Sequence, residues 1–112
     1  METDRIRSTG EALSESAELT DLSHFVVRYN VLPVGKRASS AHSHSHQEEF
    51  FFVLVGTPTL WTDGKSENLK PGDYVSLAAG TEAKHFLKND GPEEVCYLSV
   101  ASKSPEDVVG YW

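Results

Sequence analysis

The sequence predicts an all-β domain, a sandwich or barrel built from many short strands. Segments rich in β-branched and aromatic residues recur along the chain, and each is about as long as a strand. Turn-forming residues separate these segments at short intervals, and no segment after residue 20 shows a 3.6-residue apolar period. Regularly spaced short strands of this kind are typical of all-β sandwiches and barrels.

The expected strands begin at His24. The first covers residues 24–32 and ends before Pro33 and Gly35, and the later candidates are residues 41–46, 49–55, 59–62, 65–69, 74–78, 83–88 and 94–101. The pair Asp63-Gly64 predicts a tight hairpin. The run Pro71-Gly72-Asp73 has the residues of a type II turn, and residues 89–92 form a further turn.

The 112 residues predict one domain with a short arm in front of it. Residues 1–23 are expected to be an N-terminal arm, because the start of the chain is rich in Ser, Glu and Thr and poor in large apolar groups. A turn of helix around Glu11–Leu19 is the one regular element expected there. Residues 24–112 are expected to form the single barrel domain.

Composition excludes several classes of partner. The formal net charge is −7, from 17 acidic and 10 basic residues, which disfavours nucleic acid and anionic membrane surfaces. No apolar run is long enough for a membrane span or a signal peptide. Cys96 is the only cysteine, and its apolar neighbours predict a small buried hydrophobe. We therefore expect a cytoplasmic protein.

The run Phe50-Phe51-Phe52-Val53-Leu54-Val55 predicts a covered outer face. If Glu49 points into the barrel, strand alternation turns Phe51, Val53 and Val55 inward with it. Phe50, Phe52 and Leu54 then point outward, and this set is too apolar for a solvated face. The second sheet or the N-terminal arm could cover it. We favour a homodimer interface, because a domain this small has little else to cover the face.

Residues 41–56, AHSHSHQEEFFFVLVG, hold a cluster of potential metal ligands. On a strand, His42, His44 and His46 would project from one face with only small serines between them. Imidazole is a common ligand for zinc, iron, copper and nickel, and a nearby carboxylate adds an oxygen donor. A solvated polar loop is the alternative interpretation of the same residues.

Two spaced motifs give the chain a resemblance to the cupin superfamily. The first motif, G-x5-H-x-H-x3–4-E-x6-G, resembles Gly35, His42, His44, Glu49 and Gly56, with one extra residue before His42. The second, G-x5-P-x-G-x2-H-x3-N, resembles the set Gly72, Gly80, His85 and Asn89. In the second motif Ala78 replaces the proline, and four residues rather than two precede His85. The resemblance spans about residues 24–101.

The resemblance implies a double-stranded β-helix, or jelly roll, with a divalent transition metal bound inside the barrel. It implies His42, His44, Glu49 and His85 as the ligands. Three imidazoles and one carboxylate fill four positions of an octahedron, and two adjacent positions remain for water or a chelating substrate. These ligand types suit Fe, Mn, Ni or Zn. The chain looks most similar to small single-domain bacterial cupins of unassigned function.

Two functions agree with these residues. The first is a metal-dependent enzyme that acts on a small oxygenated molecule, with dioxygenase, isomerase or lyase chemistry. The second is a non-catalytic module that binds or senses a small molecule. The complete ligand set and the acidic stand-alone domain favour the enzyme. No residue outside the ligands is singled out as an acid or base, and the candidates are Tyr29, His46, Glu67 and Tyr97.

A few further side chains keep open roles. His46 fits no motif position, so it is an alternative ligand, a neighbour of the ligands or a solvated residue. Tyr29, Trp61, Phe86 and Tyr97 are expected to line or pack the barrel, and some of them to shape a pocket. The aromatic C-terminus, Tyr111-Trp112, is expected to pack on the barrel or on a partner.

Overall fold

The computed structural model describes residues 15–38, 42–44, 46–80, 84–105 and 109–111, and in segments 42–44 and 109–111 it describes the backbone alone. Every regular element of this part is a strand. The strands are β1 (Ala17–Asp21), β2 (Phe25–Leu32), β3 (His42–His44), β4 (Glu49–Val55), β5 (Thr59–Thr62), β6 (Lys65–Asn68), β7 (Tyr74–Leu77), β8 (His85–Lys88), β9 (Val95–Ser102) and β10 (Val109–Tyr111). No helix in the described part of the chain is suited to cross a membrane.

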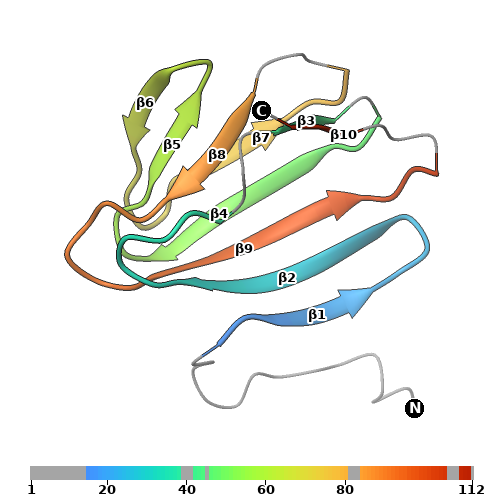
Figure 1. The fold of residues 1–112 in the computed structure, drawn as a ribbon. Helices are drawn as coiled ribbons and strands as arrows, with labels where there is room; N and C mark the ends of the chain where they lie inside the picture. Colours follow the sequence, from blue (N-terminus) through green and yellow to red (C-terminus); the bar gives the residue numbers. More distant parts are fainter. Residues whose placement is uncertain (1–14, 39–41, 45, 81–83, 106–108, 112) are drawn as a thin grey trace, which may run out of the picture.

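The strands form two five-stranded antiparallel sheets, shown in Figure 1. The first sheet has the order β1-β2-β9-β4-β7, and the second has the order β10-β3-β8-β5-β6. Strands that are neighbours in a sheet are mostly distant in sequence, so the chain crosses repeatedly from one sheet to the other. This arrangement confirms the predicted all-β double-stranded β-helix.

The core contains apolar side chains from both sheets. Its buried members are Leu32, Phe51, Val53, Leu69, Leu87, Val95 and Tyr97. Val53 and Val95 are fully buried, and Phe51 packs edge-on against Tyr97 at 5.9 Å between ring centroids. Cys96 is also buried, as its apolar neighbours predicted. The alternation of β4 is confirmed from Glu49 to Leu54, because Phe51 and Val53 are buried whereas Phe50, Phe52 and Leu54 are partly exposed.

Two predicted turns have the expected backbone geometry. Asp63 and Gly64 both have positive φ angles, +49° and +80°, and they join β5 to β6 as a two-residue hairpin. Gly72 has φ +92° and follows Pro71, and the Asp73 amide donates to the Lys70 carbonyl at 3.0 Å. That pattern is the type II turn predicted from the sequence.

Asn89 ties the loop after β8 to the end of β2. Its side chain is fully buried, and its amide nitrogen donates to the carbonyls of Leu32 at 2.9 Å and Glu93 at 2.8 Å. Its side-chain oxygen accepts a hydrogen bond from the Gly91 amide at 3.0 Å. All three bonds join Asn89 to backbone groups, so no apolar residue can replace them.

We predict that Asn89→Ala lowers the free energy of unfolding by about 2–4 kcal/mol, because the buried backbone groups would lose their partners. Asn68→Ala is the matched control, since Asn68 is exposed and accepts one hydrogen bond from Thr59. It should cost less than about 1 kcal/mol. Urea unfolding curves measure both values, and equal losses in the two variants would contradict this role for Asn89.

The structure corrects three expectations. Residues 17–19, where a turn of helix was predicted, belong to strand β1, which pairs with β2. Val55 was predicted to point inward but is 48% exposed, because a register shift between Val53 and Val55 interrupts the pairing of β4 with β9. β10 was not predicted, and it places Tyr111 opposite His42 in the second sheet. Trp112 lies outside the described residues.

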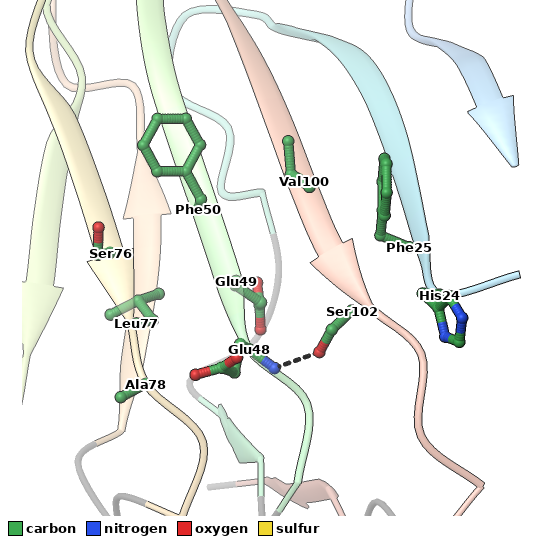
Figure 2. A pocket seen from close by; sticks show the side chains of 10 residues that line it. All are labelled: His24, Phe25, Glu48, Glu49, Phe50, Ser76, Leu77, Ala78, Val100 and Ser102. Carbon is green, nitrogen blue, oxygen red and sulfur yellow. Dashed lines mark hydrogen bonds between the residues drawn. The ribbon is translucent and has the colours of Figure 1, made fainter. Parts of the chain in front are cut away.

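The outer face of the first sheet is apolar. Phe50 lies 5.8 Å from Tyr74 between ring centroids, and Tyr74 itself is 66% exposed. A hollow of about 440 Å³ opens on this face, with Phe25, Phe50 and Val100 among its lining residues (Figure 2). Polar groups border it, since the Glu48 amide donates to the Ser102 hydroxyl at 2.7 Å.

We propose that a second copy of the chain covers this face, with Phe50, Phe52 and Leu54 in the interface. A stable interface would bury ~1,200–2,000 Å² in total. Phe52→Lys should therefore convert the dimer to a folded monomer, whereas Val34→Lys, at an exposed position in the turn after β2, should leave it dimeric. Light scattering coupled to gel filtration measures the mass. A monomeric wild-type protein at micromolar concentration would refute the interface.

Candidate metal centre

Glu49 and His85 face each other across the barrel interior. Glu49 begins β4 in the first sheet, and His85 begins β8 in the second sheet. The Nε2 atom of His85 lies 3.8 Å from Oε1 of Glu49, and the His85 residue is only 4% exposed. Two donor atoms that each bind one ion at about 2.1 Å can lie at most ~4.2 Å apart. The pair therefore fits a shared metal ion.

β3 carries the other two predicted ligands, His42 and His44. It lies between β10 and β8 in the second sheet, and His42 is the direct register partner of His85. His44 is the register partner of Val109. The side chains of His42 and His44 lie outside what the structure describes, so their role as ligands stays a prediction. Among the described side chains, no group of three or more potential ligands is found.

The remaining histidines lie elsewhere. His46 is exposed in the bend between β3 and β4. His24 precedes β2 and lines the hollow on the outer face, to which Glu49 also contributes; it is not among the residues that line the cavity beside His85 (Figure 2). Glu48 is exposed, which agrees with chain alternation next to the inward-facing Glu49.

A cavity of about 250 Å³ adjoins the Glu49–His85 pair inside the barrel. Polar and apolar side chains both line it. They include Arg28, Gln47, Phe51, Tyr97, Ser99 and Ala101. The volume is slightly below the range of about 300–1,000 Å³ that is usual for ligand pockets, so it suits a small molecule.

Tyr97 is the candidate acid or base that the structure places in this cavity. Burial, and secondly the negative charge of Glu49, raise the pKa of Tyr97 to about 12. Tyr97 therefore keeps its proton at neutral pH and can donate a hydrogen bond or a proton, but it cannot act as a base there.

The other three candidates do not share this position. Tyr29 points to the outer face of β2, because its neighbours Arg28 and Asn30 point inward. A hydrogen bond with the Cys96 side chain raises the pKa of Tyr29. His46 and Glu67 are exposed. Of the aromatic residues expected to line or pack the barrel, Trp61 and Phe86 stack on each other, 6.0 Å apart between ring centroids, and Phe86 also lines the cavity.

Sequence reasoning did not find Arg28, Gln47 or Ser99. Arg28 and Ser99 are register partners on β2 and β9, and both line the cavity. The Ser99 hydroxyl also accepts a hydrogen bond from Asn30 at 2.9 Å. A polar residue within an otherwise apolar strand was the available signal, but it is also typical of a solvated face.

Comparison with known proteins identifies the family. The Cupin_2 family model, described as a cupin domain, matches residues 29–101. The chain belongs to this cupin family. The match begins at Tyr29, within β2, and ends one residue before the end of β9. It includes Glu49, His85 and the other described cavity-lining residues except Arg28.

The relatives have different activities. Quercetin 2,3-dioxygenase of Bacillus subtilis (strain 168) is 35% identical over 81 residues, which cover 70% of this chain and 24% of that enzyme. A sugar phosphate isomerase of the cupin superfamily from Silicibacter pomeroyi has a TM-score of 0.83 and 30% identity, over 87% of this chain and 64% of that one. A putative sugar phosphate isomerase from Acidithiobacillus ferrooxidans has a TM-score of 0.75 and 31% identity, over 79% and 56%. The chain thus spans about a quarter of the dioxygenase and under two thirds of the two isomerases.

The pKa of Tyr97 predicts a loss of stability at high pH. An unfolded tyrosine ionises near pH 10, whereas Tyr97 in the folded protein holds its proton up to about pH 12. The folded state therefore binds the extra proton between these values, and its stability is complete below pH 10 and falls as pH rises towards 12. The loss should be on the order of 2–3 kcal/mol.

The difference in unfolding free energy between the wild type and Tyr97→Phe isolates this effect, because the phenylalanine cannot ionise. The wild type should lose stability relative to Tyr97→Phe as pH rises from about 10 to about 12. The exposed Tyr74, in Tyr74→Phe, is the matched control and should show no such shift. Identical pH dependence in all three proteins would contradict a buried, protonated Tyr97.

Proposed function

We propose that this cupin is a metal-dependent enzyme that acts on a small oxygenated molecule in the barrel cavity. The observation that carries the proposal is the approach of Glu49 to His85 from opposite sheets, 3.8 Å apart, at the wall of that cavity. His42 stands opposite His85 in the register of the second sheet. This backbone register, which sets His42 beside His85 on the neighbouring strand, supports His42 as a further ligand.

His42, His44, Glu49 and His85 would hold a divalent Fe, Mn, Ni or Zn ion. Such an ion supplies Lewis-acid polarisation of a carbonyl or hydroxyl oxygen when it is bound. The donor set of neutral imidazoles and one carboxylate suits all four metals. A reducing compartment such as the cytoplasm agrees with the single, buried Cys96, and we propose it as the site of action.

Isomerase- or lyase-type chemistry is the best supported by the cavity. The protonated Tyr97 hydroxyl can donate a hydrogen bond to a substrate oxygen on which negative charge develops. The likeness to two proteins named as sugar phosphate isomerases, at 30% and 31% identity, supports the same class. In this chemistry the reacting end of the substrate would lie beside Glu49 and His85, and Phe51 and the core beneath it exclude water.

Two other functions remain candidates, each on its own observation. The 35% identity to quercetin 2,3-dioxygenase supports a dioxygenase. A non-catalytic binding module is supported by the lining of the cavity, because Glu49 and His85, the described lining side chains best suited to act as a base, are both proposed metal ligands. Oxygen uptake with bound iron would identify the first. Tight ligand binding without turnover by any metal form would identify the second.

We predict that His85→Ala and His44→Ala each remove most of the metal from purified protein while the protein stays folded. Loss of one of four ligands weakens a metal site strongly, because even the loss of a hydrogen-bond partner of a ligand costs about 10–100-fold in affinity. His24→Ala is the matched control, because His24 lies on the outer face. Elemental analysis and circular dichroism measure metal content and folding. Full metal content in His85→Ala would show that the metal centre does not exist as proposed.

A further inference from the structure

Arg28 lines the same cavity as Glu49 and His85. It does so from β2, which lies on the other side of β9 from the β4 strand that carries Glu49. It lies on β2 opposite Ser99 of β9, while Glu49 on β4 lies opposite Ala101 of β9. Arg28 and Glu49 are therefore two strands apart, about 10 Å across the sheet. Only small side chains, Ser99 and Ala101, stand on β9 between them. A small molecule can thus reach from the Glu49–His85 pair to Arg28.

Arg28 supplies positive charge to a cavity in an acidic protein. Among the described residues that line the cavity, it is the only lysine or arginine. The planar guanidinium group matches the geometry of a carboxylate or phosphate and can bind either with two parallel hydrogen bonds. With a net charge of −7, the chain as a whole repels anions, and Arg28 offers a local positive charge that can hold one at this end of the cavity.

Glu18 of β1 occupies one side of this arginine. Its Oε1 atom lies 3.9 Å from the Arg28 guanidinium nitrogen, and the two side chains are 55% (Arg28) and 44% (Glu18) exposed. An ion pair that is this long and this exposed is weak, and a better-placed anion can displace it. The pair shows that a carboxylate reaches the guanidinium group at the rim of the cavity.

We propose that Arg28 binds an anionic group of the substrate, a carboxylate or a phosphate, whose oxygen-bearing other end lies at the Glu49–His85 pair. This inference rests on the proposed function and narrows its substrate class to small, oxygenated acids such as sugar acids, hydroxy acids or sugar phosphates. Glu18 competes with the substrate for Arg28. Arg28 is thus a specificity-determining residue, and Glu18 lowers the affinity for every anion.

Three compounds with one carbon skeleton test this proposal: glycerate, glycerol 3-phosphate and glycerol. Calorimetric titration of nickel-loaded protein should show that at least one of the two acids binds on the order of tenfold more tightly than glycerol. Tighter binding of glycerate would identify a carboxylate as the preferred anionic group, and tighter binding of glycerol 3-phosphate would identify a phosphate. Arg28→Gln should abolish the preference, and added salt should weaken it in the wild type.

Glu18→Gln distinguishes a role of Arg28 in binding the acid from a role in holding β1 against β2. If Arg28 binds the acid, this variant should raise the affinity for the acid by about two- to threefold, because Glu18 no longer competes. If the ion pair only stabilised β1 against β2, Arg28→Gln and Glu18→Gln would both weaken binding, and the proposal would be overturned. Arg37→Gln is the matched control. The Arg37 guanidinium carbon lies 3.8 Å from the centroid of the Phe86 ring, and Arg37 does not line the cavity. Retention of the acid preference in Arg28→Gln would also overturn the proposal.

Nickel titrations without any acid distinguish this inference from the proposed function. Arg28→Gln and Glu18→Gln should bind nickel like the wild type. A wild-type protein that binds no nickel would contradict the metal centre. The same acids titrated into that metal-free protein would still test Arg28, and loss of their binding in Arg28→Gln would support it. Equal binding of acids and glycerol by the wild type would contradict the role of Arg28 whatever the metal result.

Discussion

The register of β9 against its two neighbours determines what the barrel interior contains. β9 pairs with β2 along all eight of its residues and with β4 on its other side. Because side chains alternate, this register turns Tyr97, Ser99 and Ala101 inward. Tyr97 joins the core, whereas the small Ser99 and Ala101 leave space for the cavity. A slip of one residue would turn Leu98 and Val100 inward, fill that space and move Tyr97 to the outer face.

Most strands and turns followed from local sequence, because alternation and turn chemistry are local properties. The turns at Asp63-Gly64 and Gly72 need positive φ angles, and Asp and Gly are residue types that adopt them readily, so these turns could be predicted. β1 and β10 were missed because each is a short strand at the edge of a sheet, stabilised by its one neighbour there. The exposed position of Val55 was missed for another reason: the irregular pairing of β4 depends on β9, some forty residues away in the chain.

The site was predictable only in part, for a related reason. The spacing of Glu49 and His85 relative to nearby glycines is a motif, so these two residues could be picked from the sequence. Which residues of β2 face the interior could not be predicted from the sequence. Val27, Tyr29 and Val31 form the more apolar set, yet Arg28, Asn30 and Leu32 face the interior, since Asn30 bonds Ser99 and Leu32 is buried. When both faces of a strand are covered or apolar, composition does not tell which one meets the core.

The cavity has one part that the family motifs predict and one part that they do not. Glu49 and His85 come from strands that carry the family motifs, whereas Arg28 and Ser99 come from β2 and β9, which carry none of the motif positions. A change at Arg28 or Ser99 alters the charge and size of the space without touching the Glu49–His85 pair or the core beneath it. Recognition can therefore vary while the proposed metal chemistry is kept, and the relatives of this chain do have names as different as a dioxygenase and a sugar phosphate isomerase. Under the proposed role of Arg28, a change at position 28 alters the choice of substrate, whereas a change of a proposed ligand removes the metal that every substrate would need.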